Sequence, residues 1–363
     1  MISPCPHLAR LPVYEPGRPI EEVARELGLD PARIVKLASN ENPLGPSPKA
    51  VAAMRKAAAR AHLYPDGNGF LLRRTIAAKH RLPMEQVVLA NGSNEIIEFL
   101  GHAFLSPGDD IVVSRYAFAI YAIVAHLFRA RVNEAPARAY GHNLEAMRAA
   151  ITPRTRLVFV ANPNNPTGTA VPPAALARFL RAMPAHALAV VDEAYQEFLD
   201  RPLDTPRLLA EKPNLVVMRT FSKAHGLAGL RIGYGLASPA VAAALQKVRQ
   251  PFNANLVAQN AARAALGDAA HLRATIRAVA EGRALLHAAF RARKLEFVPS
   301  HANFILVRVG DGRKIFEALL RRGVIVRPMD GYRLPEWIRV TVGARAENRA
   351  FLKSLDAALA DAA

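Results

Sequence analysis

A lysine beyond an apolar run is the residue best suited to covalent chemistry in this 363-residue sequence. Lys223 follows the run at residues 215–218, lies next to Ser222, and precedes Arg231 by eight positions. Its amine could form a Schiff base with an aldehyde cofactor, and the hydroxyl and the guanidinium could hold a phosphate group of that cofactor. Most lysines after strands are simply solvated, so this pattern alone is a weak indication.

A carboxylate and a phenol follow another apolar run, at residues 188–191. Asp192 could pair with a protonated pyridine nitrogen, which would keep the ring cationic and let it accept electrons from a developing carbanion. Tyr195, three residues on, could hydrogen-bond a phenolic oxygen of the same ring. Acids at strand ends are also common metal ligands, but no cluster of His or Asp lies near Asp192 in the sequence, so we predict no metal site.

The segment 162–168, Asn-Pro-Asn-Asn-Pro-Thr-Gly, combines several conformational constraints. Each Asn-Pro step forces extended backbone before the proline, and Gly168 permits a sharp exit. An asparagine amide held this rigidly could donate to a phenolate oxygen. A plain polar turn is the alternative, but the density of constraints favours a functional turn.

Two further segments, each between an apolar run and a predicted helix, could bind parts of a cofactor. Ser93 and Asn94 open a helix after a strand, where free backbone N–H groups and the helix dipole attract anions. An ordinary capped helix start is the more frequent alternative. Phe118, at another junction, could stack on a planar ring, although its spacing suits a core aromatic equally well.

Short apolar runs alternate with helical segments from residue 87 onward. The runs lie at residues 87–90, 111–114, 157–161, 187–191 and 215–218. This alternation predicts an α/β fold with a mostly parallel sheet covered by helices on both faces. Ligands on such sheets bind at the carboxyl ends of the strands. Each cluster described above follows a run, so we expect one shared site.

The character of the chain changes after residue 252. Long Ala- and Arg-rich helical stretches run to about residue 293, and short strands follow around one more helix. We therefore predict an N-terminal arm at residues 1–45 that packs on the small domain, a large domain at 46–252, and a smaller α+β domain at 253–363.

Composition narrows the classes of function. A hydrophobic content of 51% with 21% charged residues is that of a globular protein. The first ten residues lack the apolar core of a signal peptide and no apolar stretch is long enough to span a bilayer, so a cytoplasmic location is expected. The single cysteine, Cys5, excludes an intramolecular disulfide. A net charge of +18 would suit a nucleic-acid-binding protein, but the arginines are scattered, without an aromatic-interleaved basic patch.

Together the motifs resemble the fold-type I, pyridoxal-phosphate (PLP)-dependent aminotransferases of class I/II. Lys223 with Ser222 and Arg231, the 162–168 turn, and Asp192 with Tyr195 carry this resemblance. The closer match is the histidinol-phosphate aminotransferase branch. It is carried by the segments 38–45, 64–67, 92–95 and 339–343, and the resemblance covers about residues 37–357.

The resemblance implies a role for each residue. Lys223 would carry the cofactor and shuttle a proton, and Asp192 would pair with the pyridine nitrogen. Asn165 and Tyr195 would bind the ring oxygen. Phe118 would stack on the ring, where many relatives have Tyr. The cofactor-binding set would be Ser93, Asn94, Phe118, Asn165, Asp192, Tyr195, Thr220, Ser222, Lys223, Arg231 and Tyr64. Tyr64 would reach the phosphate in the neighbouring subunit, which implies a homodimer with shared active sites.

Substrate recognition is implied in the same way. Arg339 would clamp the substrate carboxylate, a task suited to a planar two-pronged donor, and Arg327 could add a second cation. Asn42 and Tyr14, from the N-terminal arm, would close over the ligand. The stretch 329–336 has no clear match to the family pattern, which leaves the contacts to a substrate phosphate open.

The reaction implied is a ping-pong transamination in histidine biosynthesis. L-Histidinol phosphate and 2-oxoglutarate would give imidazole acetol phosphate and L-glutamate. Two alternatives share these motifs: an aromatic amino acid aminotransferase and a threonine-phosphate decarboxylase. A basic nucleic-acid-binding protein would explain the charge, but not the gathering of Lys223, Asp192 and the asparagine turn at strand ends.

Overall fold

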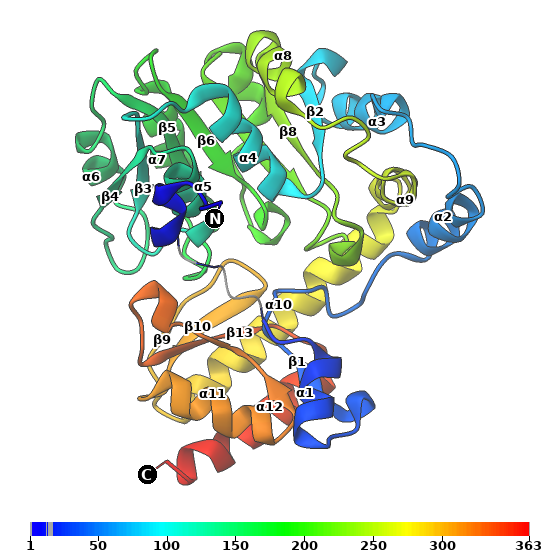
Figure 1. The fold of residues 1–363 in the computed structure, drawn as a ribbon. Coiled ribbons are helices and arrows are strands. Elements are labelled where there is room, and N and C mark those ends of the chain that lie inside the picture. The colour runs from blue at the N-terminus through cyan, green and yellow to red at the C-terminus, as the bar shows by residue number, and fades with distance from the viewer. Residues whose placement is uncertain (1, 12, 14–16, 363) are drawn as a thin grey trace.

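The computed structural model describes residues 2–11, 13 and 17–362, and its larger part is built on one seven-stranded sheet. The strand order is β2 (Val87–Ala90), β8 (Gly233–Ala237), β7 (Leu215–Thr220), β6 (Leu188–Asp192), β5 (Thr155–Ala161), β3 (Asp110–Ser114) and β4 (Arg131–Ala135). All neighbouring pairs are parallel except those of β8, which is antiparallel to β2 and β7. The predicted α/β fold with a mostly parallel sheet is confirmed (Figure 1).

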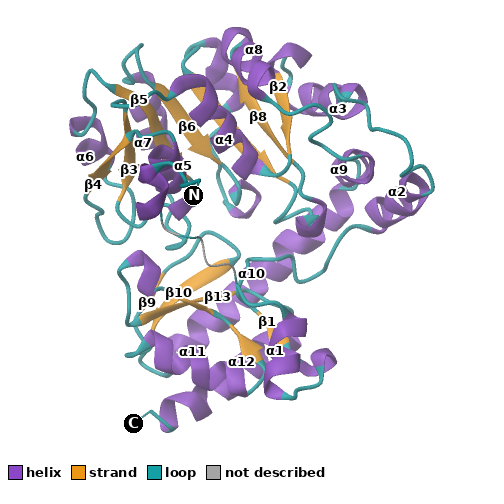
Figure 2. Cartoon of the chain, in the orientation of Figure 1, coloured by secondary structure: helices purple, strands orange, loops and turns teal. Residues whose placement is uncertain are grey.

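Helices cover both faces of this sheet because its strands are apolar on both faces (Figure 2). Alternate residues of β7 show the principle: Leu215 and Val217 belong to one core cluster, Val216 and Met218 to the other. The first cluster packs under α3 (Phe70–His80), α6 (Leu144–Ala149), α7 (Pro173–Arg181) and α9 (Leu256–Leu266). The second packs under α4 (Ser93–Phe104), α5 (Ala119–Leu127) and α8 (Pro239–Val248).

Two strands of the sheet were not expected from the sequence. Edge strand β4, Arg-Val-Asn-Glu-Ala, is polar and partly exposed, so it lacks the apolar run of a buried strand. Strand β8, Gly-Tyr-Gly-Leu-Ala, is rich in glycine, which has a low strand propensity. Both are held in the sheet by pairing with buried apolar strands, β4 with β3, and β8 with β2 and β7.

The smaller part has a four-stranded antiparallel sheet in the order β12 (Arg327–Pro328), β13 (Trp337–Thr341), β10 (Phe304–Arg308) and β9 (Phe297–Val298). It packs with α10 (Ala269–Ala292), α11 (Gly312–Arg321) and α12 (Arg345–Ala360), and α10 runs between the two parts (Figure 1).

The N-terminal segment packs on this smaller part. Strand β1 (Val35–Lys36) pairs in parallel with β11 (Val324–Ile325), and Val23 of α1 (Ile20–Leu27) is buried in the same core. The next helix, α2 (Pro48–Ala58), lies beyond the predicted arm and packs on α9 of the larger part. The exact domain boundaries at residues 45 and 252 stay predictions. None of the helices in the described ranges is long and apolar enough to cross a membrane.

Candidate active site

A cavity of about 280 Å³ lies at the carboxyl ends of the central strands, on the side of the smaller sheet. Most of the residues predicted for the site line it together: Ser93, Asn94, Phe118, Asn165, Asp192, Tyr195, Thr220, Ser222, Lys223, Arg231, Arg327 and Arg339. Parallel strands deliver them to one edge because their carboxyl ends meet there.

Lys223 lies in the turn after β7, and its Nζ donates a hydrogen bond to the backbone oxygen of Ser39 at 2.8 Å. Burial, together with the nearby guanidinium groups of Arg339 and Arg231, lowers the pKa of this amine to about 8, against the opposing charge of Glu41. A substantial fraction of the amine is therefore neutral near pH 8, as a nucleophile or proton acceptor must be.

Asp192 ends β6 and is buried with both carboxylate oxygens bonded. Tyr121 Oη donates to Oδ2 at 2.7 Å, and the backbone N–H of Ala194 donates to Oδ1 at 3.1 Å. Burial raises the pKa of this carboxyl, while the hydrogen bond from Tyr121 opposes the rise. The side chain lines the cavity, so it can present a carboxylate to a ring nitrogen.

A second pair of contacts fixes the phenol of Tyr195. Asn40 Nδ2 donates to Tyr195 Oη at 3.0 Å, and the Tyr195 ring packs edge-on against Phe304 with centroids 5.1 Å apart. The hydroxyl is thus held at the cavity wall.

The start of α4 forms a cradle for a phosphate. Its first N–H groups, at Ser93 and Asn94, line the cavity together with Thr220, Ser222 and Arg231, and Arg231 Nη1 donates to Ser222 Oγ at 3.2 Å. Gly92 permits this approach: its φ is +83°, and a Cβ at this position would lie 2.3 Å from Arg231 Nη2.

We therefore expect Gly92→Ala to weaken binding of the phosphorylated cofactor by about tenfold or more, because Arg231 must move out of the cradle. Equilibrium dialysis with PLP, the cofactor that the sequence resemblance implies, measures this. Gly108→Ala is the matched control, since Gly108 also has a positive φ of +92° but nothing lies within 4 Å of a Cβ there. An equal loss of affinity in both variants would show that backbone strain alone causes the effect.

Arg339 and Arg327 lie opposite each other on paired strands β13 and β12. Arg339 is buried, donates from Nη2 to the backbone oxygen of Ala38 at 2.8 Å, and donates from Nη1 to Asn165 Oδ1. This contact orients the amide of Asn165, whose Nδ2 group can still donate to a ring oxygen. The arrangement brings two guanidinium groups to one wall of the cavity, a site for an anionic substrate group.

A buried ion pair ties the strands that carry these residues. Arg219 and Glu193 are both buried, with Arg219 Nη2 2.7 Å from Glu193 Oε2. Arg219 directly precedes Thr220, and Glu193 directly follows Asp192. The ion pair therefore fixes the end of β7 against the end of β6.

Among the described residues, two of those predicted for the site, Asn42 and Tyr64, do not line this cavity. Asn42 Nδ2 donates to Ala224 O at 2.9 Å and to Thr275 Oγ1 at 3.1 Å, which anchors the arm to the lysine turn. Its contact with a substrate stays a prediction. Tyr64 is 82% exposed and stacks on Phe252 with centroids 4.7 Å apart, away from the cavity of its own chain. Tyr14 lies outside the described residues.

Three polar side chains that line the cavity were missed in the sequence: Ser39, Asn40 and Tyr121. Ser39 and Asn40 stand beside Asn42 in the 38–45 motif, but the motif does not show which side chain faces inward. Tyr121 lies three positions after Phe118, one helical turn away, and this spacing could have indicated it.

The donor set fits PLP. A cradle of backbone N–H groups, hydroxyls and a guanidinium matches a phosphate, a buried carboxylate matches a ring nitrogen, and an amide and a phenol match a ring oxygen. Phe118 also lines the cavity and can stack on the ring; it packs edge-on against Tyr121, with ring centroids 5.7 Å apart.

Known proteins share this architecture. The chain matches the model of the family Aminotransferase class I and II over residues 32–355. It is 51% identical over 343 residues to a histidinol-phosphate aminotransferase of Akkermansia muciniphila, covering 94% of each chain. It is 53% identical over 352 residues to histidinol-phosphate aminotransferase 1 of Cupriavidus pinatubonensis, covering 95% of this chain and 94% of the relative. The crystal structure of a histidinol-phosphate aminotransferase from Sinorhizobium meliloti in complex with pyridoxal-5'-phosphate superposes with a TM-score of 0.90 at 28% identity, covering 99% of this chain and 98% of that one.

Proposed function

The chain belongs to the class I and II aminotransferases, and we propose that it transfers an amino group between L-histidinol phosphate and 2-oxoglutarate in histidine biosynthesis. The products are imidazole acetol phosphate and L-glutamate. The enzyme is PLP-dependent. The observation that carries the proposal is that one cavity gathers Lys223, Asp192, the phosphate cradle at Arg231, and the paired guanidinium groups of Arg327 and Arg339.

PLP, when bound, supplies an electron sink for a carbanion at the substrate Cα. The chain supplies the proton transfers: the amine of Lys223, with its pKa of about 8, takes a proton from the substrate Cα and returns one. The carboxylate of Asp192 would hold a proton on the ring nitrogen, and the hydrogen bond from the Tyr121 hydroxyl orients that carboxylate and favours its ionised form against the effect of burial.

Substrate binding is assigned to the two arginines. Glutamate presents a carboxylate and histidinol phosphate a phosphate ester, and a guanidinium binds either anion through paired N–H groups. Arg339 has a fixed orientation, because the backbone oxygen of Ala38 and the side chain of Asn165 hold it. The basic charge of the chain, +18, adds a favourable field for anionic substrates.

The substrate assignment is tested by comparing kcat/KM for histidinol phosphate, phenylalanine and threonine phosphate, with 2-oxoglutarate as the acceptor. We expect histidinol phosphate to exceed the other two by at least about a hundredfold, because only it offers both a phosphate ester and a ring. A preference for phenylalanine would make the enzyme an aromatic aminotransferase. Release of CO₂ from threonine phosphate would make it a decarboxylase.

A homodimer in the cytoplasm belongs to the same proposal. Tyr64 and Phe252 form an exposed aromatic stack, and Leu63, Phe70 and Leu71, close to Tyr64 in sequence, are 45–47% exposed. Exposed apolar side chains of this kind are typical of an interface. In the dimer, Tyr64 of one subunit reaches the phosphate cradle of its partner.

Mixed dimers test the shared site. We expect dimers formed from Lys223→Ala and Tyr64→Ala chains to be more active than either parent, because each mixed dimer has one site with both native residues. Random exchange after co-expression should give about a quarter of the wild-type activity. Activity equal to the average of the two parents would show that each site is built from one chain.

A further inference from the structure

The peptide bond between Ala161 and Asn162 is held from both sides. It joins the last residue of β5 to the turn at residues 162–168. The N–H of Asn162 donates to the backbone oxygen of Asp192 at 2.9 Å. A trans peptide directs its C=O and N–H groups to opposite sides, so the oxygen of Ala161 faces away from β6, toward β3. Nε2 of His142 lies 2.8 Å from that oxygen.

Strand β3 does not reach this oxygen. Its pairing with β5 ends at Val112 opposite Val158, three residues before Ala161, while β6 pairs with β5 as far as Asp192. The Ala161 oxygen therefore lies beyond the ladder on one side, and a carbonyl at a buried position needs another donor. The imidazole of His142 supplies that donor.

The sequence between β4 and α6 fixes the place of this histidine. Residues 138–141 form a tight turn whose two central residues have a positive φ. Asn143, directly after His142, caps α6 through its side chain. The turn also lies close to the exit of the 162–168 segment, since a Cβ on Gly141 would be 3.3 Å from Thr169 Oγ1. Both neighbours of the histidine in the chain are thus held.

The contact uses a neutral imidazole in one tautomer. Burial lowers the pKa of His142, although the hydrogen bond to Ala161 opposes this, so the ring carries a single N–H near neutral pH. The carbonyl needs that N–H on Nε2, which leaves Nδ1 unprotonated. Nδ1 is buried and has no hydrogen-bond partner within the described ranges. The ring therefore donates to Ala161 without adding a charge to this part of the site.

The turn beyond this peptide is rigid, so the first peptide decides how Asn165 is oriented. The backbone N–H of Val171 donates to Asn162 Oδ1 at 2.9 Å, and the N–H of Asn164 donates to the oxygen of Thr169 at 2.8 Å. These bonds join the entry of the turn to its exit. A rotation of the first peptide would therefore move the Asn165 amide as part of one unit.

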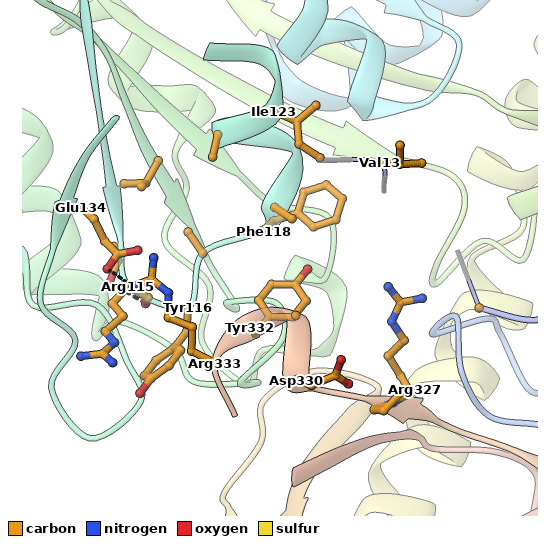
Figure 3. A pocket seen from close by; sticks show the side chains of 18 of the residues that line it. Val13, Arg115, Tyr116, Phe118, Ile123, Glu134, Arg327, Asp330, Tyr332 and Arg333 are labelled. Carbon is orange, nitrogen blue, oxygen red and sulfur yellow. Dashed lines mark hydrogen bonds and ion pairs between the residues drawn. The ribbon is translucent and has the colours of Figure 1, made fainter. Parts of the chain in front are cut away.

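Two contacts outside the turn limit how far it can move. Asn164 Nδ2 donates at 3.0 Å to the backbone oxygen of Tyr116, whose side chain lines the cavity of about 570 Å³ next to the catalytic one (Figure 3). Arg339 Nη1 donates to Asn165 Oδ1. Because both contacts remain when the histidine is replaced, we expect a displaced amide and not a collapsed turn.

We propose that His142 is a positioning residue, which orients the Asn165 amide toward the ring oxygen of the cofactor. It does so by fixing the peptide between Ala161 and Asn162. The same peptide bonds the backbone of Asp192, so the groups assigned to the ring oxygen and to the ring nitrogen are held to one another. The inference rests on the proposed function, because it concerns how the amide assigned to the ring oxygen is placed.

The test compares His142→Phe with His142→Gln in the PLP-loaded enzyme. Phenylalanine keeps a ring of similar size without a donor, whereas the amide of glutamine can donate from nearly the place of Nε2. A hydrogen bond to the ring oxygen favours its ionised form, so the pH midpoint of the visible absorbance of bound PLP reports the position of the Asn165 amide.

For His142→Phe we expect this midpoint to rise by about 0.5–1 pH unit and kcat to fall by about tenfold. The affinity for PLP should stay within about threefold of wild type, because the phosphate cradle is untouched. For His142→Gln we expect kcat within about twofold of wild type and a midpoint within about 0.2 pH unit. Should the phenylalanine variant not fold, His142→Asn takes its place, because the shorter amide does not reach the Ala161 oxygen.

His186→Phe is the matched control. His186 Nε2 bonds the backbone oxygen of Thr152 at 3.1 Å, the same kind of contact at the opposite end of β5 and β6. Neither the midpoint nor kcat should change in this variant. Equal shifts in His142→Phe and His142→Gln would overturn the proposal, since packing of the imidazole and not its N–H would then matter.

Asn165→Ala distinguishes this inference from the proposed function. It should raise the midpoint at least as far as His142→Phe, and the double variant should show no further rise, because both changes act through one amide. An unchanged midpoint in Asn165→Ala would make the ring-oxygen assignment wrong, and the inference with it. A rise in Asn165→Ala without one in His142→Phe would overturn the role of His142 alone. So would a further rise in the double variant.

Discussion

Lys223→Ala should lower turnover by more than about 10⁴-fold, because it removes both the amine that binds the cofactor covalently and the group that moves the proton at the substrate Cα. The folded structure should survive. The amine is largely buried with its pKa lowered to about 8, so its removal relieves the burial of a charge. Steady-state assays with histidinol phosphate and 2-oxoglutarate measure the loss, and circular dichroism checks the fold.

Lys247→Ala is the control for this change, because Lys247 lies exposed near the end of α8 and away from the cavity. A small primary amine added to Lys223→Ala should restore part of the rate, since the substitution leaves space beside the Ser39 carbonyl. In the wild-type apo-protein, acylation of Lys223 should rise with pH to a midpoint near pH 8, because only the neutral amine reacts and its pKa lies there. Near-normal activity in Lys223→Ala would make the central assignment wrong.

The placement of these residues could be predicted because it depends on local sequence and strand order. Lys223, Asp192 and Ser93 each follow an apolar run, and runs that form parallel strands deliver their following residues to one edge. An apolar run and the residues that follow it are thus enough to place a catalytic group. Failure to predict strands β4 and β8 did not change this placement.

Contacts over long sequence separations could not be predicted in this way. Asn40 reaches Tyr195 across 155 residues, while Asn42, two positions away, turns to Ala224 and Thr275. Both are asparagines in one turn-rich segment, and only the packing of the arm on the smaller part decides which one faces the cavity. The register of β12 on β13 places Arg327 opposite Arg339. This register could not be predicted from the local sequence pattern either.

Asp192→Asn should lower kcat by about 10²- to 10³-fold with a much smaller change in KM, because the amide keeps the shape of the side chain but cannot hold the ring nitrogen protonated. The buried position strengthens the effect, since no water replaces the lost charge there. The position remains filled, so the affinity for PLP should fall far less than in Gly92→Ala. Parallel measurements of kcat and of PLP affinity distinguish this result from a collapsed site, in which both would fall together.

Tyr121→Phe tests whether activity depends on the ionised form of Asp192 and not only on the presence of its side chain. The hydrogen bond from Tyr121 Oη, 2.7 Å long, lowers the pKa of Asp192 against the effect of burial. Its removal must raise that pKa, so the carboxylate is lost at a higher pH and activity declines earlier as the pH falls. We expect the acid limb of the kcat profile to move up by about one pH unit, with a smaller loss at high pH. Tyr234→Phe removes a buried phenol that bonds His80 outside the cavity, and its profile should match the wild type. An unshifted acid limb in Tyr121→Phe would mean that the ionisation of Asp192 does not control the rate.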